Sequence, residues 1–258
     1  MKKLTFALLG VLLFSASSNG SEWGTIKGSV LLDDEVPEAR LLIKKGATVD
    51  EAGNKVSDPN VCSATDIMAN DLVVNSETKG IANVFIYLYK PPKNIHPGST
   101  EVKKTVIFDQ KNCVFKPHAL VLQAGQTVEV LNSDPIAHNT HSNPFKNQQQ
   151  NILVPANSTK GNGVLFPTAV GESVPLLVNC DIHPAMKAYW MVTAHPYCAV
   201  TDDKGNFTIK NLPVGDHEFR VWHERPGYID RKYKVTVAAG DNEPLEPLKV
   251  KLSQLEVK

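Results

Sequence analysis

The sequence has 258 residues, enough for one large or two modest domains, and its 27 basic residues balance 27 acidic ones. Removal of a leader that carries Lys2 and Lys3 would leave a net charge of about −2, which argues against nucleic acid or anionic lipid as a partner. Short β-rich runs separated by Gly, Pro, Asn and Asp dominate the chain. We therefore expect an all-β protein built from β-sandwiches.

The first 20 residues have the pattern of a secretory signal peptide. A basic start is followed by an almost wholly apolar run over residues 4–14 and by small polar residues over 15–20. The apolar run is too short to cross a bilayer, so we expect no membrane span. The mature protein is expected in a bacterial periplasm or outside the cell.

The next part of the chain predicts few strands. Residues 23–30 alternate as a first strand, and 41–43 form a second, short one. The polar stretch 44–77 offers few core residues, and we expect a long surface loop with at most one turn of helix there. Residues 81–89 form a buried strand, after which 93–104 make an extended connector.

A second unit begins near Thr105. Apolar runs at 106–108 and 113–122 are followed by an alternating, half-buried strand at 127–132. The Asn- and Gln-rich residues 143–163 are expected to form an exposed excursion. Two further strands, 173–179 and 188–193, enclose the short segment from Cys180 to Met186.

That segment carries the clearest chemistry of the sequence. Cys180, His183 and Met186 place a thiol, an imidazole and a thioether within seven residues. Cysteine and two histidines with a weak axial methionine form the blue-copper electron-transfer site. His138, in a loop after Asp134, is the candidate for the second imidazole.

Several motifs in this unit resemble those of the cupredoxin family, with a ligand loop of the amicyanin type. In chain order the motifs are Phe115-Lys116-Pro117, Ala124-Gly125-Gln126-Thr127-Val128, Asn132-Ser133-Asp134, His138-Asn139 and Cys180-Asp181-Ile182-His183-Pro184-Ala185-Met186. The resemblance covers about residues 105–194 and implies a Greek-key β-sandwich with one type 1 copper. It implies His138, Cys180 and His183 as equatorial ligands and Met186 as the axial ligand. It also implies that Asn139 braces the ligand loop and that His183 lies nearest the surface, as the port for electrons.

The last part of the chain resembles the carboxypeptidase regulatory-like, or prealbumin-like, β-sandwich. The motifs are Thr201-Asp202 followed by Gly205-Asn206-Phe207, and then Leu212-Pro213-Val214-Gly215. Such a module also needs strands like 24–30 and 84–88, which precede the cupredoxin-like unit. We therefore expect residues 22–104 and 195–258 to form one discontinuous sandwich, with the cupredoxin domain of residues 105–194 inserted between them.

The remaining cysteines and histidines leave alternatives open. If Cys180 is a ligand, three cysteines remain, and we favour a disulfide between Cys62 and Cys113, which leaves Cys198 free. His141, three residues after His138, is a competing ligand, although a solvent-facing or supporting position is expected for it. His118 is expected to be structural.

The sequence therefore predicts an exported mononuclear type 1 copper protein that shuttles single electrons between redox partners. A redox protein of the cytochrome c or periplasmic dehydrogenase class would be such a partner. We expect no enzyme, because a copper oxidase or nitrite reductase needs a second metal centre and no His-x-His pair supplies one. The alternatives are a periplasmic copper carrier, with the same ligands but exchangeable metal, and a metal-free secreted binding scaffold.

Overall fold

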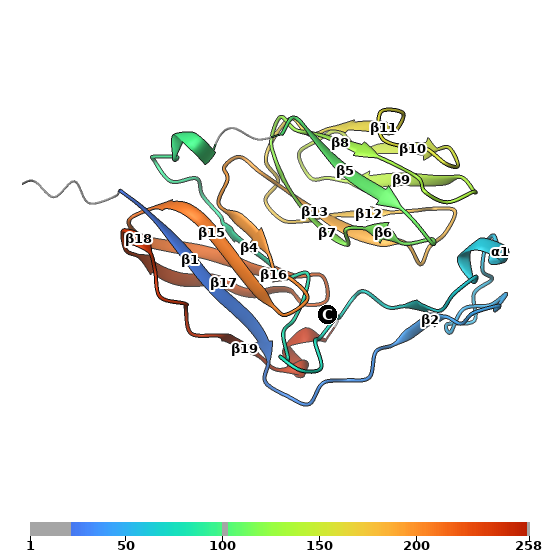
Figure 1. Cartoon of the computed structure of the whole chain (residues 1–258), viewed down its shortest axis with the longest axis horizontal. Helices are drawn as coiled ribbons and strands as arrows, with labels where there is room; N and C mark the ends of the chain where they lie inside the picture. Colours follow the sequence, from blue (N-terminus) through green and yellow to red (C-terminus); the bar gives the residue numbers. More distant parts are fainter. Residues whose placement is uncertain (1–21, 100–102, 257–258) are drawn as a thin grey trace, which may run out of the picture.

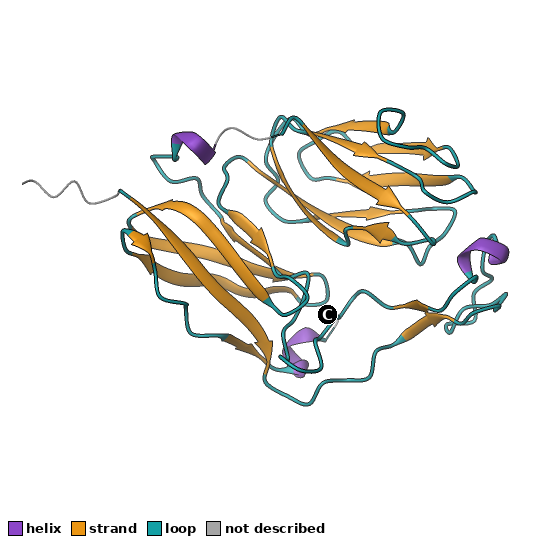
Figure 2. Ribbon diagram, in the orientation of Figure 1, coloured by secondary structure: helices purple, strands orange, loops and turns teal. Residues whose placement is uncertain are grey.

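The computed structural model describes residues 22–99 and 103–256, so the predicted signal peptide over residues 1–20 lies outside the described part. The protein is nearly all β and consists of two β-sandwiches that lie side by side (Figures 1 and 2). This confirms the predicted all-β fold class. Among the described residues, no helix is long and apolar enough to cross a membrane.

The first sandwich consists of two sheets from both ends of the described chain. The strands are β1 (Trp23–Leu32), β4 (Phe85–Leu88), β14 (Cys198–Val200), β15 (Asn206–Pro213), β16 (Gly215–His223), β17 (Gly227–Val237), β18 (Gly240–Asp241) and β19 (Leu248–Val250). One sheet has the order β15-β1-β18 with β19 also on β1, and the other has the order β14-β4-β16-β17. Residues from both sheets, such as Ile26, Ile86 and Phe219, share one buried core.

The second sandwich is built from the chain between these two parts. Its strands are β5 (Thr105–Gln110), β6 (Phe115–Lys116), β7 (Ala119–Gln123), β8 (Thr127–Val130), β9 (His138–Asn143), β10 (Gln150–Val154), β11 (Val164–Pro167), β12 (Leu176–Asn179) and β13 (Lys187–Thr193). The sheet orders are β10-β9-β12-β13-β7 and β11-β8-β5-β6. Trp190 fills the core between them, and the ring of Phe108 meets it edge-on at a centroid distance of 5.0 Å.

The two sandwiches contact each other through a small aromatic cluster. Trp222 and Phe85 of the first sandwich pack with Met191 and Ala119 of the second. The rings of Trp222 and Tyr189 lie 5.2 Å apart. The contact buries large apolar side chains, so the sandwiches are packed on each other rather than merely tethered.

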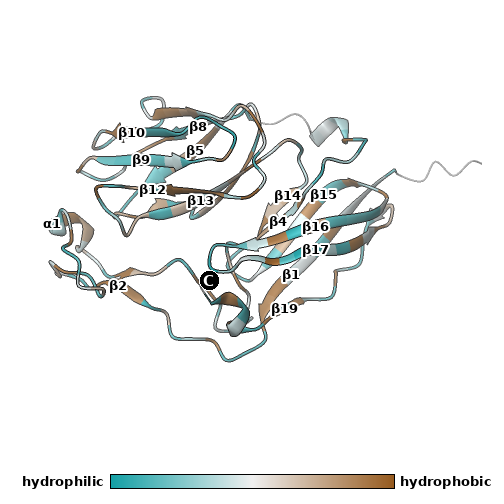
Figure 3. Cartoon of the chain, turned by 180° about the vertical axis from the view of Figure 1, so that it is seen from behind, coloured by the Kyte–Doolittle hydropathy of each residue, from teal (hydrophilic) through white to brown (hydrophobic). Residues whose placement is uncertain are grey.

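Several predicted elements differ from the observed ones. The strand expected over 81–89 is shorter, and that expected over 113–122 is divided into β6 and β7 around Pro117, which has no amide hydrogen to donate to a ladder. The excursion 143–163 contains β10, which pairs with β9. The polar composition of this stretch suggested a loop rather than a strand. The strand β9, with which β10 pairs, is also hydrophilic, as its teal colour in Figure 3 shows, yet it is largely buried.

The predicted surface loop over 44–77 is the largest correction. A two-stranded sheet of β2 (Leu41–Ile43) and β3 (Ile67–Met68) leaves the first sandwich, and between its strands lies the one-turn helix α1 (Pro59–Cys62). Val56 and Cys62 are buried in the core of the second sandwich, not exposed. The only other helices in the described ranges are the 3₁₀ turns η1 (Pro97–Ser99) and η2 (Leu252–Leu255).

The favoured disulfide is confirmed. Cys62 bonds to Cys113, while Cys180 and Cys198 are free. The bond joins the excursion between β2 and β3 to the turn between β5 and β6. It therefore fixes part of the N-terminal chain to the second sandwich.

Candidate metal centre

The four predicted ligands come from two neighbouring strands of the second sandwich. His138 begins β9, Cys180 directly follows β12, and His183 and Met186 lie in the turn between β12 and β13. Strands β9 and β12 pair antiparallel, so the start of one lies beside the end of the other. The fold thus brings together residues that are more than 40 positions apart in the sequence.

Three of the donor atoms converge at this point. The Nδ1 atoms of His138 and His183 are 2.9 Å apart, and the Sγ atom of Cys180 lies 3.6 Å from Nδ1 of His183. The three side chains form a group whose donor atoms all lie within 4.8 Å of one another. The exposed fractions of His138, His183 and Cys180 are 0%, 5% and 1%, so water is excluded from the centre.

Met186 closes the turn on the same side. It is 1% exposed and belongs to the same core cluster as Cys180. Its amide donates a hydrogen bond to the carbonyl of His183, and its carbonyl accepts one from the amide of Cys180. The two bonds hold the turn so that the four predicted side chains stay at one end of the sandwich.

A carboxylate binds the outer nitrogen of each imidazole. Nε2 of His138 lies 2.9 Å from Asp134, and Nε2 of His183 lies 3.0 Å from Asp58. Since these nitrogens donate to carboxylates, the two Nδ1 lone pairs face each other, which is favourable only with a proton or a metal ion between them. This arrangement fits a cation held by Nδ1 of both residues.

The electrostatics of the centre favour a charged thiolate. Burial alone would raise the pKa of Cys180, but its polar contacts with the imidazoles of His138 and His183 outweigh burial and lower the pKa to about 6. Burial opposes the charged form of His138, yet Asp134 and Cys180 raise its pKa to about 9. Burial also works against ionised Asp134, whose pKa is nevertheless low because His138 and two backbone amides bind it.

Asn139 braces the ligand loop, as the resemblance implied. Its Oδ1 atom accepts hydrogen bonds from the amides of Asp181 and Ile182 at 2.8 and 3.2 Å. The thiol of Cys180 also lies 3.2 Å from this oxygen. One amide side chain thus fixes the backbone on the C-terminal side of the thiol.

His141 does not join the donor group. Residues three apart on a strand face opposite sides of the sheet, so His141 points away from the side that His138 faces. Its Nδ1 atom contacts the carboxylate of Asp181 at 3.2 Å, and its Nε2 atom accepts a hydrogen bond from Gln149. The competing ligand considered from the sequence is therefore a supporting residue.

His183 is 5% exposed, the highest exposed fraction among the four candidate ligands, so it lies nearest the surface of them, while its role as the electron port stays a prediction. The imidazole is buried, and Asp58 covers its outer nitrogen. Sequence reasoning missed both carboxylates. Asp134 could have been found, because it stands four residues before His138, whereas Asp58 is 125 residues from its partner and gives no local signal.

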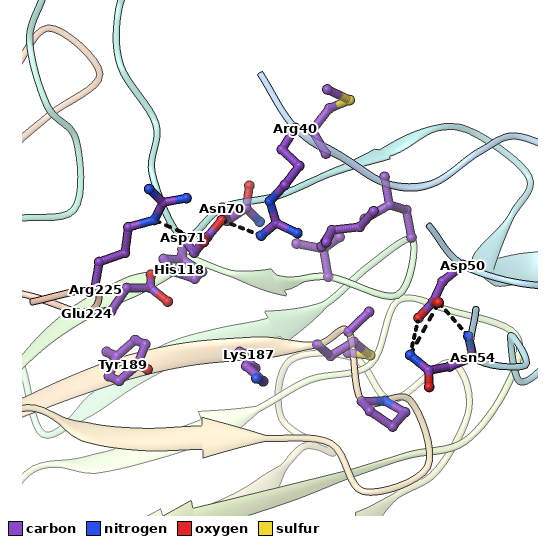
Figure 4. Close-up of a pocket in the computed structure, with 17 residues that line it drawn as sticks. Arg40, Asp50, Asn54, Asn70, Asp71, His118, Lys187, Tyr189, Glu224 and Arg225 are labelled. Carbon is purple, nitrogen blue, oxygen red and sulfur yellow. Dashed lines mark hydrogen bonds and ion pairs between the residues drawn. The ribbon is translucent and has the colours of Figure 1, made fainter. Parts of the chain in front are cut away.

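Two cavities border the ligand loop. One of about 240 Å³ is lined by His183, Met186 and the Cys62–Cys113 disulfide. The other, of about 510 Å³, extends from Met186 toward the first sandwich (Figure 4). In it Arg40 and Arg225 both bind Asp71, at 2.9 and 3.1 Å, and His118 contacts Glu224 across the two sandwiches, in agreement with the structural role expected for it.

Comparisons with known proteins find cupredoxins among solved structures. No protein-family model matches the sequence, and no curated protein is significantly similar to it. A copper-containing nitrite reductase from Thermus scotoductus is 19% identical with a TM-score of 0.29, covering 34% of this chain and 22% of that one. Amicyanin from Paracoccus versutus is 14% identical with a TM-score of 0.30, covering 42% of this chain and 96% of its own. The reduced Cu(I) form of a mutant amicyanin is 16% identical with a TM-score of 0.29, covering 42% of this chain and 97% of its own. Similarity at this level does not assign a function to the chain.

Proposed function

We propose that this protein is an exported mononuclear copper protein that passes single electrons between redox proteins. His138, Cys180 and His183 would hold the ion, with Met186 as a weak fourth ligand. The observation that carries the proposal is the convergence of two Nδ1 atoms and one low-pKa thiol in a buried group.

The donor set matches the chemistry of this metal. Thiolate and thioether sulfur with imidazole nitrogen suits copper in both of its common oxidation states, so a bound copper ion would supply a reversible one-electron change. The protein contributes a fixed arrangement: Asp134 orients His138, and Asn139 holds the loop behind Cys180. Burial excludes water and limits rearrangement, and both favour rapid electron transfer over substrate binding.

The same burial argues against the two alternatives. A copper carrier needs ligands that a partner can reach, whereas all four candidates are at most 5% exposed. A metal-free scaffold gives no reason for two buried imidazoles to direct their Nδ1 atoms at each other and at a thiol. We further propose that the centre transfers electrons without turning over a substrate of its own.

The leader sequence and the balanced charge suggest where the protein acts and with what. A signal peptide over residues 1–20 would export it to the periplasm or beyond. Its partner would be a redox protein of the cytochrome c or periplasmic dehydrogenase class. The contact between the two proteins would be brief and small, as transient redox contacts are.

The test is the visible and electron-paramagnetic-resonance spectrum of residues 21–258 after addition of one equivalent of Cu(II). We expect an intense blue charge-transfer band with narrow copper hyperfine splitting, absent from Cys180→Ser and unchanged in the matched control Cys198→Ser. A protein that binds copper without the band would point to the carrier alternative. A protein that takes up no copper would contradict the proposal.

A further inference from the structure

The excursion between β2 and β3 covers the proposed centre from outside its own sandwich. We call residues 44–66 the cap segment; in Figure 1 it carries α1 to the end of the second sandwich. Its apolar side chain Val56 is 5% exposed, and Cys62 is 2% exposed and bonded to Cys113. The cap segment is therefore packed onto the second sandwich and covalently fixed there.

Asp58 of the cap segment contacts the centre through its carboxylate. Its Oδ2 atom lies 3.0 Å from Nε2 of His183, although the two residues are 125 positions apart. The carboxylate does not cap α1, even though Asp58 occupies the N-cap position where aspartate normally does so. Its side chain is directed to the imidazole instead.

The backbone at Asp58 adopts the left-handed conformation, with φ of 47° and ψ of 53°. Aspartate adopts this region more readily than most residues other than glycine. Hydrogen bonds from the amides of Val61 and Cys62 to the Asp58 carbonyl hold it in place.

The disulfide links the two carboxylates of the centre. Asp58 lies four residues before Cys62, while Asp134 accepts hydrogen bonds from the amides of Asn112 and Cys113 at 2.6 and 2.8 Å. The carboxylate that orients His183 therefore lies near Cys62 in the chain, and the carboxylate that orients His138 is hydrogen-bonded to the backbone at Cys113, the other half of the disulfide. Carboxylate partners of this kind set the tautomer of a ligating histidine and strengthen it as a ligand.

We propose that Asp58 is a positioning residue that holds His183 as a ligand and closes its outer edge, so that the cap segment retains the metal against exchange. The inference rests on the proposed copper site. It gives the N-terminal part of the chain a role at the proposed copper site. Copper would leave the site only after the hydrogen bond between Asp58 and His183 has broken. Loss of such a partner typically weakens metal binding about 10–100-fold.

The experiment measures transfer of copper from the reduced, loaded protein to an excess of a Cu(I)-specific chelator, followed by the colour of the chelate. We expect Asp58→Asn to release copper about tenfold or more faster than the wild type, with an altered Cu(II) resonance spectrum. The matched control is Asp66→Asn, which removes the same charge from the same segment, where Asp66 binds the amide of Lys45. It should release copper at the wild-type rate.

A metal-free measurement separates this inference from the proposed function. In the metal-free protein, the Nε2 proton of His183 should be visible by nitrogen–proton correlation, because Asp58 accepts it in a hydrogen bond and the imidazole itself is buried. Asp58→Ala should abolish that signal and leave the Nε2 signal of His138, which Asp134 holds, in place. If the wild type binds no copper, the proposed function is wrong, but the metal-free measurement still tests the contact between Asp58 and His183. Equal release rates, or a His183 signal that persists in Asp58→Ala, would overturn the role of Asp58.

Discussion

His223 illustrates how burial at a single residue makes stability depend on pH. It is 1% exposed, and its Nε2 atom has no hydrogen-bond partner among the described residues. Burial, assisted by the nearby Arg225 and His118 and only partly opposed by Asp71, lowers its pKa to about 4. The folded protein therefore keeps this histidine neutral in a range where the unfolded chain protonates it.

The sign of the effect follows from proton binding. Between pH 6.5 and pH 4 the unfolded state binds a proton at His223 that the folded state does not, so stability is complete above pH 6.5 and falls with acidification. We expect this residue to account for a loss on the order of 2 kcal/mol between about pH 7 and pH 5. Urea unfolding at pH 7 and at pH 5 measures the change in the free energy of unfolding between the two pH values, and in His223→Gln this change should be smaller by that amount. His217→Gln, on the same strand, should retain it, and an unchanged difference in His223→Gln would contradict the assignment.

At the level of elements, the cap segment depends on its disulfide. The excursion between β2 and β3 has little regular structure of its own, so its placement relies on a few buried side chains and the bond from Cys62 to Cys113. The two cysteines are 51 positions apart, and the bond therefore restricts a long loop in the unfolded chain.

Replacing both cysteines should weaken the second sandwich. For a loop of this length the expected loss is about 4 kcal/mol in the free energy of unfolding, if entropy of the unfolded chain dominates. Urea unfolding of Cys62→Ser/Cys113→Ser, followed by tryptophan fluorescence, measures it. Cys198→Ser, which removes a free thiol, is the control, and a double variant with the wild-type midpoint would refute the stabilising role.

At the scale of the whole molecule, the aromatic contact joins two cores that are otherwise separate. Trp222 is 8% exposed and packs with Phe85 of its own sandwich and Met191 of the other. The chain also reaches the second sandwich at the cap segment and returns to the first sandwich between β13 and β14. These features favour cooperative unfolding of the sandwiches.

Truncation of Trp222 should separate the two unfolding events. Trp222→Ala removes a buried indole, for which about 3–5 kcal/mol is typical. Calorimetry should show one transition for the wild type and two resolved transitions for the variant. Tyr89→Ala, at a site 48% exposed beside β4, should behave as the wild type. A single transition at an unchanged temperature in Trp222→Ala would show that the contact does not couple the sandwiches.

Local patterns predicted much of the fold and part of the candidate site. The alternation that begins at residue 127 predicted β8, and the apolar run over 188–193 predicted β13, because both patterns involve residues that are adjacent in the sequence. The short spacing from Cys180 to Met186 likewise predicted that their side chains lie in one turn. His138 was harder, since only the resemblance indicated that β9 would lie beside β12.

What the sequence by itself determined is therefore the all-β class, most strands and the short ligand segment, all of which follow from residues close together in the chain. Only the tertiary structure decided that residues 44–66 cover the centre and that Asp58 and Asp134 hold the two imidazoles. These features arise from long-range packing and from one covalent bond, and an aspartate 125 residues from its histidine leaves no periodic or spacing signal. The physical reason is that burial and charge pairing depend on where the chain returns in space, which local propensity does not encode.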